Sequence, residues 1–213
     1  MITIEKFVFN AFGENTYLLY DETKEAVIID PGCYEQQEKD ELAYFIDTND
    51  LKVVKLIYTH CHVDHILGNN FISETYNIKP EIHEAGLPFL ERGQEQAKVY
   101  GFNIEKAILP EFYFEDEDLI KFGNSELKVV YTPGHADGSV CFINNGQKFV
   151  ITGDVLFRDS IGRTDFPTGD FDILMKSIHE KLFTLEDDFT VYCGHGPETS
   201  IGYEKVNNPF IRF

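Results

Sequence analysis

Short apolar segments of strand length recur along the chain, and many are rich in Val, Ile, Phe and Tyr. Ile2 and Ile4 alternate with Thr3 and Glu5, a period-two pattern that predicts a half-buried strand. Six further runs have strand length: NTYLLYD, EAVIIDPG, KVVKLIYTH, ELKVVYTPGH, KFVITGD and FTVYCGHG. The last five end in Gly, Pro or polar residues, so each is expected to lead from a strand into a loop.

Helical patterns separate some of these strands, at residues 35–48, 66–76, 84–99 and 170–183. The last has an apolar stripe at spacings of three and four, formed by Phe171, Leu174, Ile178 and Leu182. Between 118 and 152 several strands follow one another without a helix, which favours two sheets with helices outside them over one doubly wound sheet. The acidic, aromatic segment 110–118 is expected to be a solvated loop.

Length and composition indicate one globular domain over residues 1–213. The 213 residues are 43% hydrophobic and 26% charged, enough apolar mass for a sizeable core, and no low-complexity linker interrupts them. The interleaved strand and helix patterns predict an α/β (α+β) fold class.

The charge balance argues against two classes of partner. The chain has 37 Asp and Glu against 18 Lys and Arg, a net charge of −19, and no basic run, so nucleic acid and membrane surfaces are not expected as partners. Four widely spaced cysteines without a Cys-x-x-Cys pair, no signal peptide and no apolar stretch of about 18 residues predict a cytoplasmic protein. No coiled-coil pattern indicates an oligomeric state.

The main chemical signal is a cluster of histidines directly after the run KVVKLIY. It reads Thr59-His60-Cys61-His62-Val63-Asp64-His65, and imidazoles with a carboxylate in so few positions suit a borderline metal ion such as Zn²⁺. Three more candidate ligands also follow apolar runs: His135, Asp154 and His195. Strand ends that meet at one sheet edge would bring all of them together.

A count of ligands predicts a site for two metal ions. One set is His60, His62 and His135; a second is Asp64, His65 and His195; and the carboxylate of Asp154 bridges the two. Asp30, in IIDPG, is either a partner that orients a ligand imidazole or a simple turn residue. Cys61 is expected to pack in the core. His83 and His179 stand outside the count and are expected to be surface or packing residues.

With these residues assembled, the chain resembles the metallo-β-lactamase superfamily over nearly its whole length, with Asp30, the His60–His65 cluster, His135, Asp154 and His195 in matching order. The resemblance implies a four-layer αββα sandwich with the metal site at one edge. Asp154 argues against the true β-lactamases, which typically have Cys there.

Two stretches narrow the resemblance to the small single-domain glyoxalase II-like hydrolases of bacteria: Ser160 to Pro167 (SIGRTDFP) and Gly194 to Thr199 (GHGPET). By this resemblance Arg163 or Arg158 meets an anionic substrate, although Arg163 pairing with Asp165 in a structural turn is an equal alternative. Only 18 residues follow His195, too few for the C-terminal helical region that helps eukaryotic glyoxalase II hold glutathione. This puts glutathione in doubt as the carrier.

The implied function is a binuclear hydrolase that cleaves a small thioester, such as the 2-hydroxyacyl thioester S-lactoylglutathione, with a hydroxide shared by two Zn²⁺ ions. Fe or Mn can replace zinc on such ligands. Asp64 is assigned a catalytic role beside its role as ligand. The first alternative is an iron-dependent persulfide dioxygenase of the same superfamily, with His60, His135 and Asp154 as its two-His, one-carboxylate site. A purely structural metal site is a second alternative. A lactonase or phosphodiesterase on this scaffold also stays open.

Overall fold

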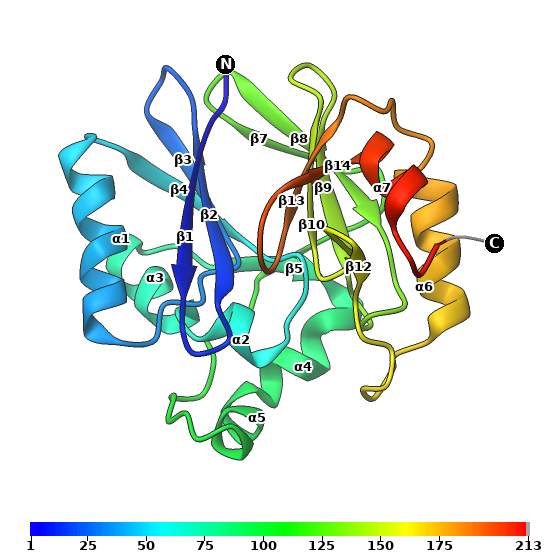
Figure 1. Ribbon diagram of the computed structural model, residues 1–213. Helices are drawn as coiled ribbons and strands as arrows, with labels where there is room; N and C mark the ends of the chain where they lie inside the picture. The colour runs from blue at the N-terminus through cyan, green and yellow to red at the C-terminus, as the bar shows by residue number, and fades with distance from the viewer. Residues whose placement is uncertain (212–213) are drawn as a thin grey trace.

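The computed structural model describes residues 1–211 and contains two six-stranded sheets packed face to face (Figure 1). The first sheet has the strand order β1 (Thr3–Phe9), β2 (Glu14–Tyr20), β3 (Glu25–Ile29), β4 (Lys52–Ile57), β5 (Pro80–His83) and β6 (Phe112–Phe114). The second has the order β14 (Thr199–Ser200), β13 (Thr190–Cys193), β10 (Phe149–Gly153), β9 (Val140–Asn144), β8 (Ser125–Tyr131) and β7 (Leu119–Phe122). Strands β11 (Leu156–Phe157) and β12 (Ser160–Ile161) form a small separate hairpin.

Helices cover the outer face of each sheet. On the first sheet lie α1 (Gln36–Thr48) and α3 (Asn69–Tyr76); on the second lie α6 (Phe171–Ser177), the π-helix η2 (Ile178–Leu182) and α7 (Ile201–Asn207). The remaining helices gather at the lower edge in Figure 1: α2 (Val63–Ile66), the short 3₁₀ helix η1 (Glu84–Gly86), α4 (Leu87–Glu91) and α5 (Gly93–Val99). The four layers are the αββα sandwich expected from the sequence.

Three separate hydrophobic clusters explain the layers. In β3, Ala26 and Ile28 pack outward with Leu42 and Ile46 of α1, while Val27 faces the other sheet. This alternation follows from the period of two in a strand. The cluster between the sheets joins residues of β2, β3 and β4 to residues of β8, β9 and β10, and the third cluster lies between the second sheet and α6, η2 and α7.

The structure corrects one expectation and refines two. Segment 110–118 is not wholly a loop, because β6 pairs in parallel with β5 and Phe114 is buried between the sheets. The acidic residues of this segment favour a solvated loop in the sequence pattern and conceal the short aromatic strand Phe112–Phe114. The helical segment 66–76 begins earlier, with α2 at Val63, and the segment 84–99 is divided into η1, α4 and α5.

Among the described residues, none of the helices is long and apolar enough to cross a membrane.

Candidate metal centre

The candidate ligands come from both sheets and meet at one edge of the sandwich. His60 follows β4, and the chain turns there into α2, for which His62 is the N-cap. From the second sheet, His135 follows β8, Asp154 follows β10 and His195 follows β13. Loops at the ends of packed strands thus bring residues far apart in sequence to one place.

The side chains form two groups in which the possible ligand atoms lie within 4.8 Å of one another. We refer to His60, His62 and His135 as the histidine group, and to Asp64, His65 and His195 as the carboxylate group. In the histidine group, His62 Nδ1 lies 2.9 Å from His135 Nε2. In the carboxylate group, His195 Nε2 lies 3.1 Å from Asp64 Oδ2, and His65 Nε2 lies 3.7 Å from the same oxygen.

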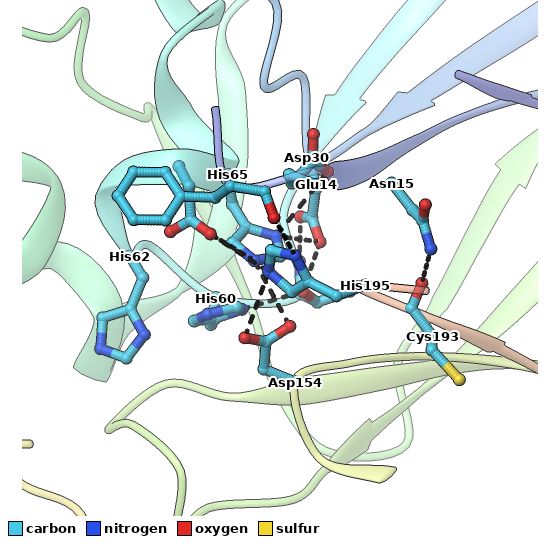
Figure 2. Close-up of polar contacts among 12 residues, drawn as sticks. Glu14, Asn15, Asp30, His60, His62, His65, Asp154, Cys193 and His195 are labelled. Atoms are coloured by element: carbon cyan, nitrogen blue, oxygen red, sulfur yellow. Dashed lines mark hydrogen bonds and ion pairs between the residues drawn. The ribbon is translucent and has the colours of Figure 1, made fainter. Parts of the chain in front are cut away.

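Asp154 lies between the two groups. Its Oδ1 is 3.4 Å from His65 Nε2, and its Oδ2 is 3.6 Å from His195 Nε2 and 3.7 Å from His135 Nε2. Figure 2 shows its carboxylate directed toward the imidazoles, with Asp30 and Glu14 on the far side of His65. One carboxylate is therefore within reach of both groups.

In four of the imidazoles the Nδ1 atom has a hydrogen-bond partner outside the centre. The Nε2 atom, which faces the centre, is therefore the nitrogen left to bind a metal ion. His65 Nδ1 donates to Asp30 Oδ2 at 3.1 Å. His60 Nδ1 donates to the hydroxyl of Thr59 at 3.1 Å, and that hydroxyl donates in turn to Asp30. Asp30 thus holds one imidazole of each group, directly or through Thr59.

Backbone carbonyls hold the other two imidazoles. His135 Nδ1 donates to the carbonyl of Arg163 at 2.8 Å, and His195 Nδ1 donates to the carbonyl of Phe12 at 3.3 Å. His62 is the exception, because its Nδ1 faces inward and its ring lies edge-on between Phe89 and Phe166. The loop around Arg163 therefore has a positioning role, whatever its side chain binds.

The buried polar atoms without a hydrogen-bond partner test whether this centre fits a metal ion. Three of them, among the residues described, are His60 Nε2, His65 Nε2 and Asp154 Oδ1, all directed into the centre. Leaving such atoms unpaired costs about 1–3 kcal/mol each. Divalent cations would satisfy all three, and imidazole with carboxylate is a donor set suited to Zn, Fe or Mn. The residues fit the group that the sequence predicts.

The electrostatic environments of the two groups differ. Burial lowers the pKa of His60 well below its usual range, and burial with the neighbouring His135 lowers the pKa of His62 to about 3. Burial by itself would also lower the pKa of His65, but the carboxylates of Asp64 and Asp154 outweigh it and raise that pKa. The pKa of His195 is likewise raised, because its hydrogen bond to Asp64 outweighs burial.

The start of β2 holds the loop that carries His195, a feature that the sequence analysis missed. The Asn15 side-chain amide donates to the carbonyls of Cys193 and Gly196, both at 2.9 Å, and its backbone N–H donates to the carbonyl of Gly194 at 2.7 Å. Tyr17 donates its hydroxyl to the carbonyl of Cys193 at 2.6 Å. Strand β2 of the first sheet thus fixes the His195 loop of the second.

Two further residues next to the centre come from the start of β2 and from the His195 loop. Glu14 is wholly buried, and its Oε1 lies 3.9 Å from His65 Nδ1. A side chain at Gly194 would collide with the carboxylate of Asp154 and approach the ring of His65. The available signal was the run of polar residues Glu14 to Thr16 at the start of an otherwise apolar strand.

A cleft of about 910 Å³ opens over the centre. Arg163 lines it, with its guanidinium over the Phe166 ring and in a two-bond ion pair with Asp165 at 2.9 and 2.7 Å. The turn pair with Asp165 is therefore present, and the contact of Arg163 with an anionic substrate stays a prediction. Arg158 is not part of the cleft lining, and its guanidinium lies over the ring of Tyr203.

The remaining candidates lie elsewhere. Cys61 is buried in the cluster between the first sheet and its helices, as expected for a packing residue. His83 stacks on Tyr131, with ring centroids 4.2 Å apart, and His179 lies edge-on against Phe183. His83 is therefore a half-buried packing residue, and His179 is an exposed surface residue.

Comparison with known proteins places the chain in a family. The model of the metallo-β-lactamase superfamily matches residues 10–195. The hydroxyacylglutathione hydrolase GloC of Haemophilus influenzae is 37% identical over 212 residues, which cover 99% of this chain and 98% of that protein.

Several solved structures share the fold. BLEG-1 B3 metallo-β-lactamase superposes with a TM-score of 0.87 at 31% identity and covers 99% of this chain and 100% of its own. TTHA1623, solved in a di-iron-bound form, has a TM-score of 0.86 at 32% identity, with 97% and 99% covered. ETHE1 from Myxococcus xanthus has a TM-score of 0.78 at 29% identity, with 97% and 83% covered.

Proposed function

The chain belongs to the metallo-β-lactamase superfamily, and on that premise we propose that it is a metal-dependent hydrolase of small thioesters. The observation that carries the proposal is the position of the Asp154 carboxylate, which lies within reach of both the histidine group and the carboxylate group. The 37% identity to a hydroxyacylglutathione hydrolase supports the thioester as substrate class. A 2-hydroxyacyl thioester such as S-lactoylglutathione is the proposed substrate.

We assign the metal ligands as the sequence predicts. The histidine group would hold one ion and the carboxylate group the other, with Asp154 within reach of both groups, and two Zn²⁺ are the proposed pair. Ions bound there would supply Lewis acidity to the thioester carbonyl and lower the pKa of water to about 7.

The protein's own groups orient the reactants. Burial by itself would raise the pKa of Asp64, but His65 and the hydrogen bond from His195 outweigh it and lower that pKa, so the carboxylate is ionised at neutral pH. It is therefore an acceptor for a proton of the attacking water. Water adds to the carbonyl carbon, the carbon–sulfur bond breaks, and the thiolate leaves without a strong general acid because thiols have a pKa of about 8.5.

The cleft gives the substrate its position. The apolar side chains of Phe89, Phe157 and Phe166 line it above the centre and limit access of bulk water to the thioester. Arg163 is the proposed contact for an anionic part of the substrate. Arg158, proposed with it from the sequence, lies outside the cleft lining and would have to move to take part.

A second candidate is an iron-dependent persulfide dioxygenase. The likeness to ETHE1 favours keeping it, since that protein is 29% identical to this chain over most of its length. The di-iron form of TTHA1623, at 32% identity, supports iron as a metal but not the single-iron count. A single iron would then use His60, His135 and Asp154, a two-His, one-carboxylate set.

Elemental analysis of the purified protein, followed by two assays, separates these functions. The proposed hydrolase is expected to contain about two metal ions per chain and to release thiol from S-lactoylglutathione without oxygen uptake. About one iron per chain with oxygen uptake on glutathione persulfide would replace it with the dioxygenase. A chromogenic cephalosporin is the control substrate suggested by the likeness to BLEG-1, and hydrolysis of it in preference to thioesters would contradict the proposal.

A further inference from the structure

One wall of the cleft is a single face of α5 and of the residues directly before and after it. Arg92, Glu95, Gln96, Val99 and Tyr100 all line the cleft. Their spacings of three, four, seven and eight residues place them on one side of a helix. The wall is polar where α5 begins and apolar where it ends, and the ring of Tyr100 meets Phe12 of the β1–β2 turn edge-on at 5.4 Å.

The polar part of this wall holds a positive and a negative charge that do not neutralise each other. Among residues 1–211 there are three arginines, and Arg158 and Arg163 each have a carboxylate partner and an aromatic ring. Arg92, in contrast, has no ion pair, side-chain hydrogen bond or ring contact within that described part of the chain, although acidic residues outnumber basic ones by 37 to 18. Glu95, one turn further, also lines the cleft and forms no ion pair with Arg92.

The volume of the cleft indicates that more than the acyl group binds there. A cleft of about 910 Å³ is in the range that encloses a whole drug-sized ligand, whereas a lactoyl group has only a few heavy atoms. The thiol carrier is therefore expected to lie inside the cleft, against α5. The groups on this wall then determine which carriers bind.

We propose that Arg92 and Glu95 form a subsite for a zwitterionic α-amino acid group at the end of the thiol carrier. The guanidinium matches a carboxylate in a two-bond geometry, and the Glu95 carboxylate accepts from the ammonium group. Side chains three residues apart on a helix are about 5–6 Å apart at Cβ, a separation that suits two charges on one carbon. The subsite rests on the proposed thioester function for its location and restores an amino-acid thiol such as glutathione as the carrier.

Binding of S-methylglutathione, which is not hydrolysed, tests the subsite by calorimetry. Arg92→Gln is expected to raise the Kd about tenfold and Glu95→Gln about threefold, because charged hydrogen bonds are lost. Lys98→Gln is the matched control: it removes one positive charge from the same exposed helix but outside the cleft lining, and its Kd should stay within twofold of the wild type. With the amino group of the ligand acetylated, the effect of Glu95→Gln should disappear while that of Arg92→Gln remains.

Several results would overturn the subsite. They are no binding by the wild-type protein, an unchanged Kd in Arg92→Gln, or an equal loss in Lys98→Gln. Stronger dependence on Arg92 for S-methyl-coenzyme A than for S-methylglutathione would assign the arginine to a phosphate instead.

The binding test is independent of turnover. Arg92-dependent binding in a protein that cleaves no thioester would support the subsite and contradict the hydrolase. Thioester cleavage with Arg92-independent binding would do the reverse.

Discussion

The two ligand groups lie side by side, yet their electrostatic surroundings differ. The histidine group has neutral imidazoles, since burial lowers the pKa values of His60 and His62. The carboxylate group has imidazoles whose pKa values are raised by Asp64 and Asp154, with Asp30 behind His65. Because carboxylate-rich sites suit harder cations and imidazole suits zinc and its neighbours, the two groups should differ in metal affinity and preference.

The change expected to break this contrast most completely is Asp154→Asn, since Asp154 is the carboxylate within reach of both groups. Its loss should lower thioester hydrolysis on the order of a thousandfold and reduce the metal content. Steady-state kinetics with elemental analysis check this. Asp137→Asn removes a carboxylate from the same cleft but from neither group and serves as the control. Full activity in Asp154→Asn would contradict the shared role.

Asp30→Asn tests whether the carboxylate behind both groups acts more strongly on one of them. Asn tolerates the positive φ of 50° at this position, so backbone strain is avoided. Because His65 contacts Asp30 directly and His60 does so through Thr59, we expect a loss of about 10–100-fold in metal affinity, mainly at the carboxylate group. Competition with a chromogenic chelator measures the affinity of each of the two metal-binding steps. Equal weakening of both binding steps would remove this distinction between the groups.

Asn15→Ala should act on the carboxylate group alone, because Asn15 holds only the His195 loop. We expect about a tenfold loss of affinity for one of the two ions, with the other unchanged. Tyr17→Phe is the graded comparison, since it removes a bond to Cys193 but leaves the Asn15 contact with Gly196 in place. A larger effect in Tyr17→Phe than in Asn15→Ala would show that the strand contact, rather than the Asn15 clamp, positions His195.

Asp21 provides a test away from both groups. It joins the β2–β3 turn to the β7–β8 turn by accepting hydrogen bonds from Thr23, Asn124 and Ser125. Burial by itself would raise its pKa, but these hydrogen bonds outweigh burial and lower the pKa to about 2.

The stability from Asp21 is therefore present above the unfolded pKa of about 3.9 and is lost as pH falls toward 2, about 2 kcal/mol in all. Asp21→Asn should reduce the acid dependence of unfolding in this window and leave metal content unchanged. Urea unfolding between pH 2 and 5 is the measurement. An unaltered pH profile would show that the turn contacts contribute little.

Sequence patterns located the candidate ligands because each follows an apolar run, and strand ends on a two-sheet scaffold meet at one edge. What they missed depends on how the two sheets sit against each other. Asn15 holds the His195 loop because the start of β2 in one sheet packs against the end of β13 in the other. These segments lie about 180 positions apart in the chain. The position of Arg92 does not follow from the sequence, because the pattern predicts one helix over 84–99 and the break at Arg92 decides which face meets the cleft.

Each ligand group draws two residues from the segment after β4, where the histidine group uses the loop and the carboxylate group uses α2, and one residue from a loop of the second sheet. An ion bound to either group would therefore tie together the two halves of the sandwich, at the end opposite to the Asp21 contacts. Metal binding and folding are then thermodynamically coupled, so that the free energy of metal binding adds to the free energy of unfolding. Chelation should lower the melting temperature and speed amide hydrogen exchange in β4 and β13 before it does so in the strands near Asp21.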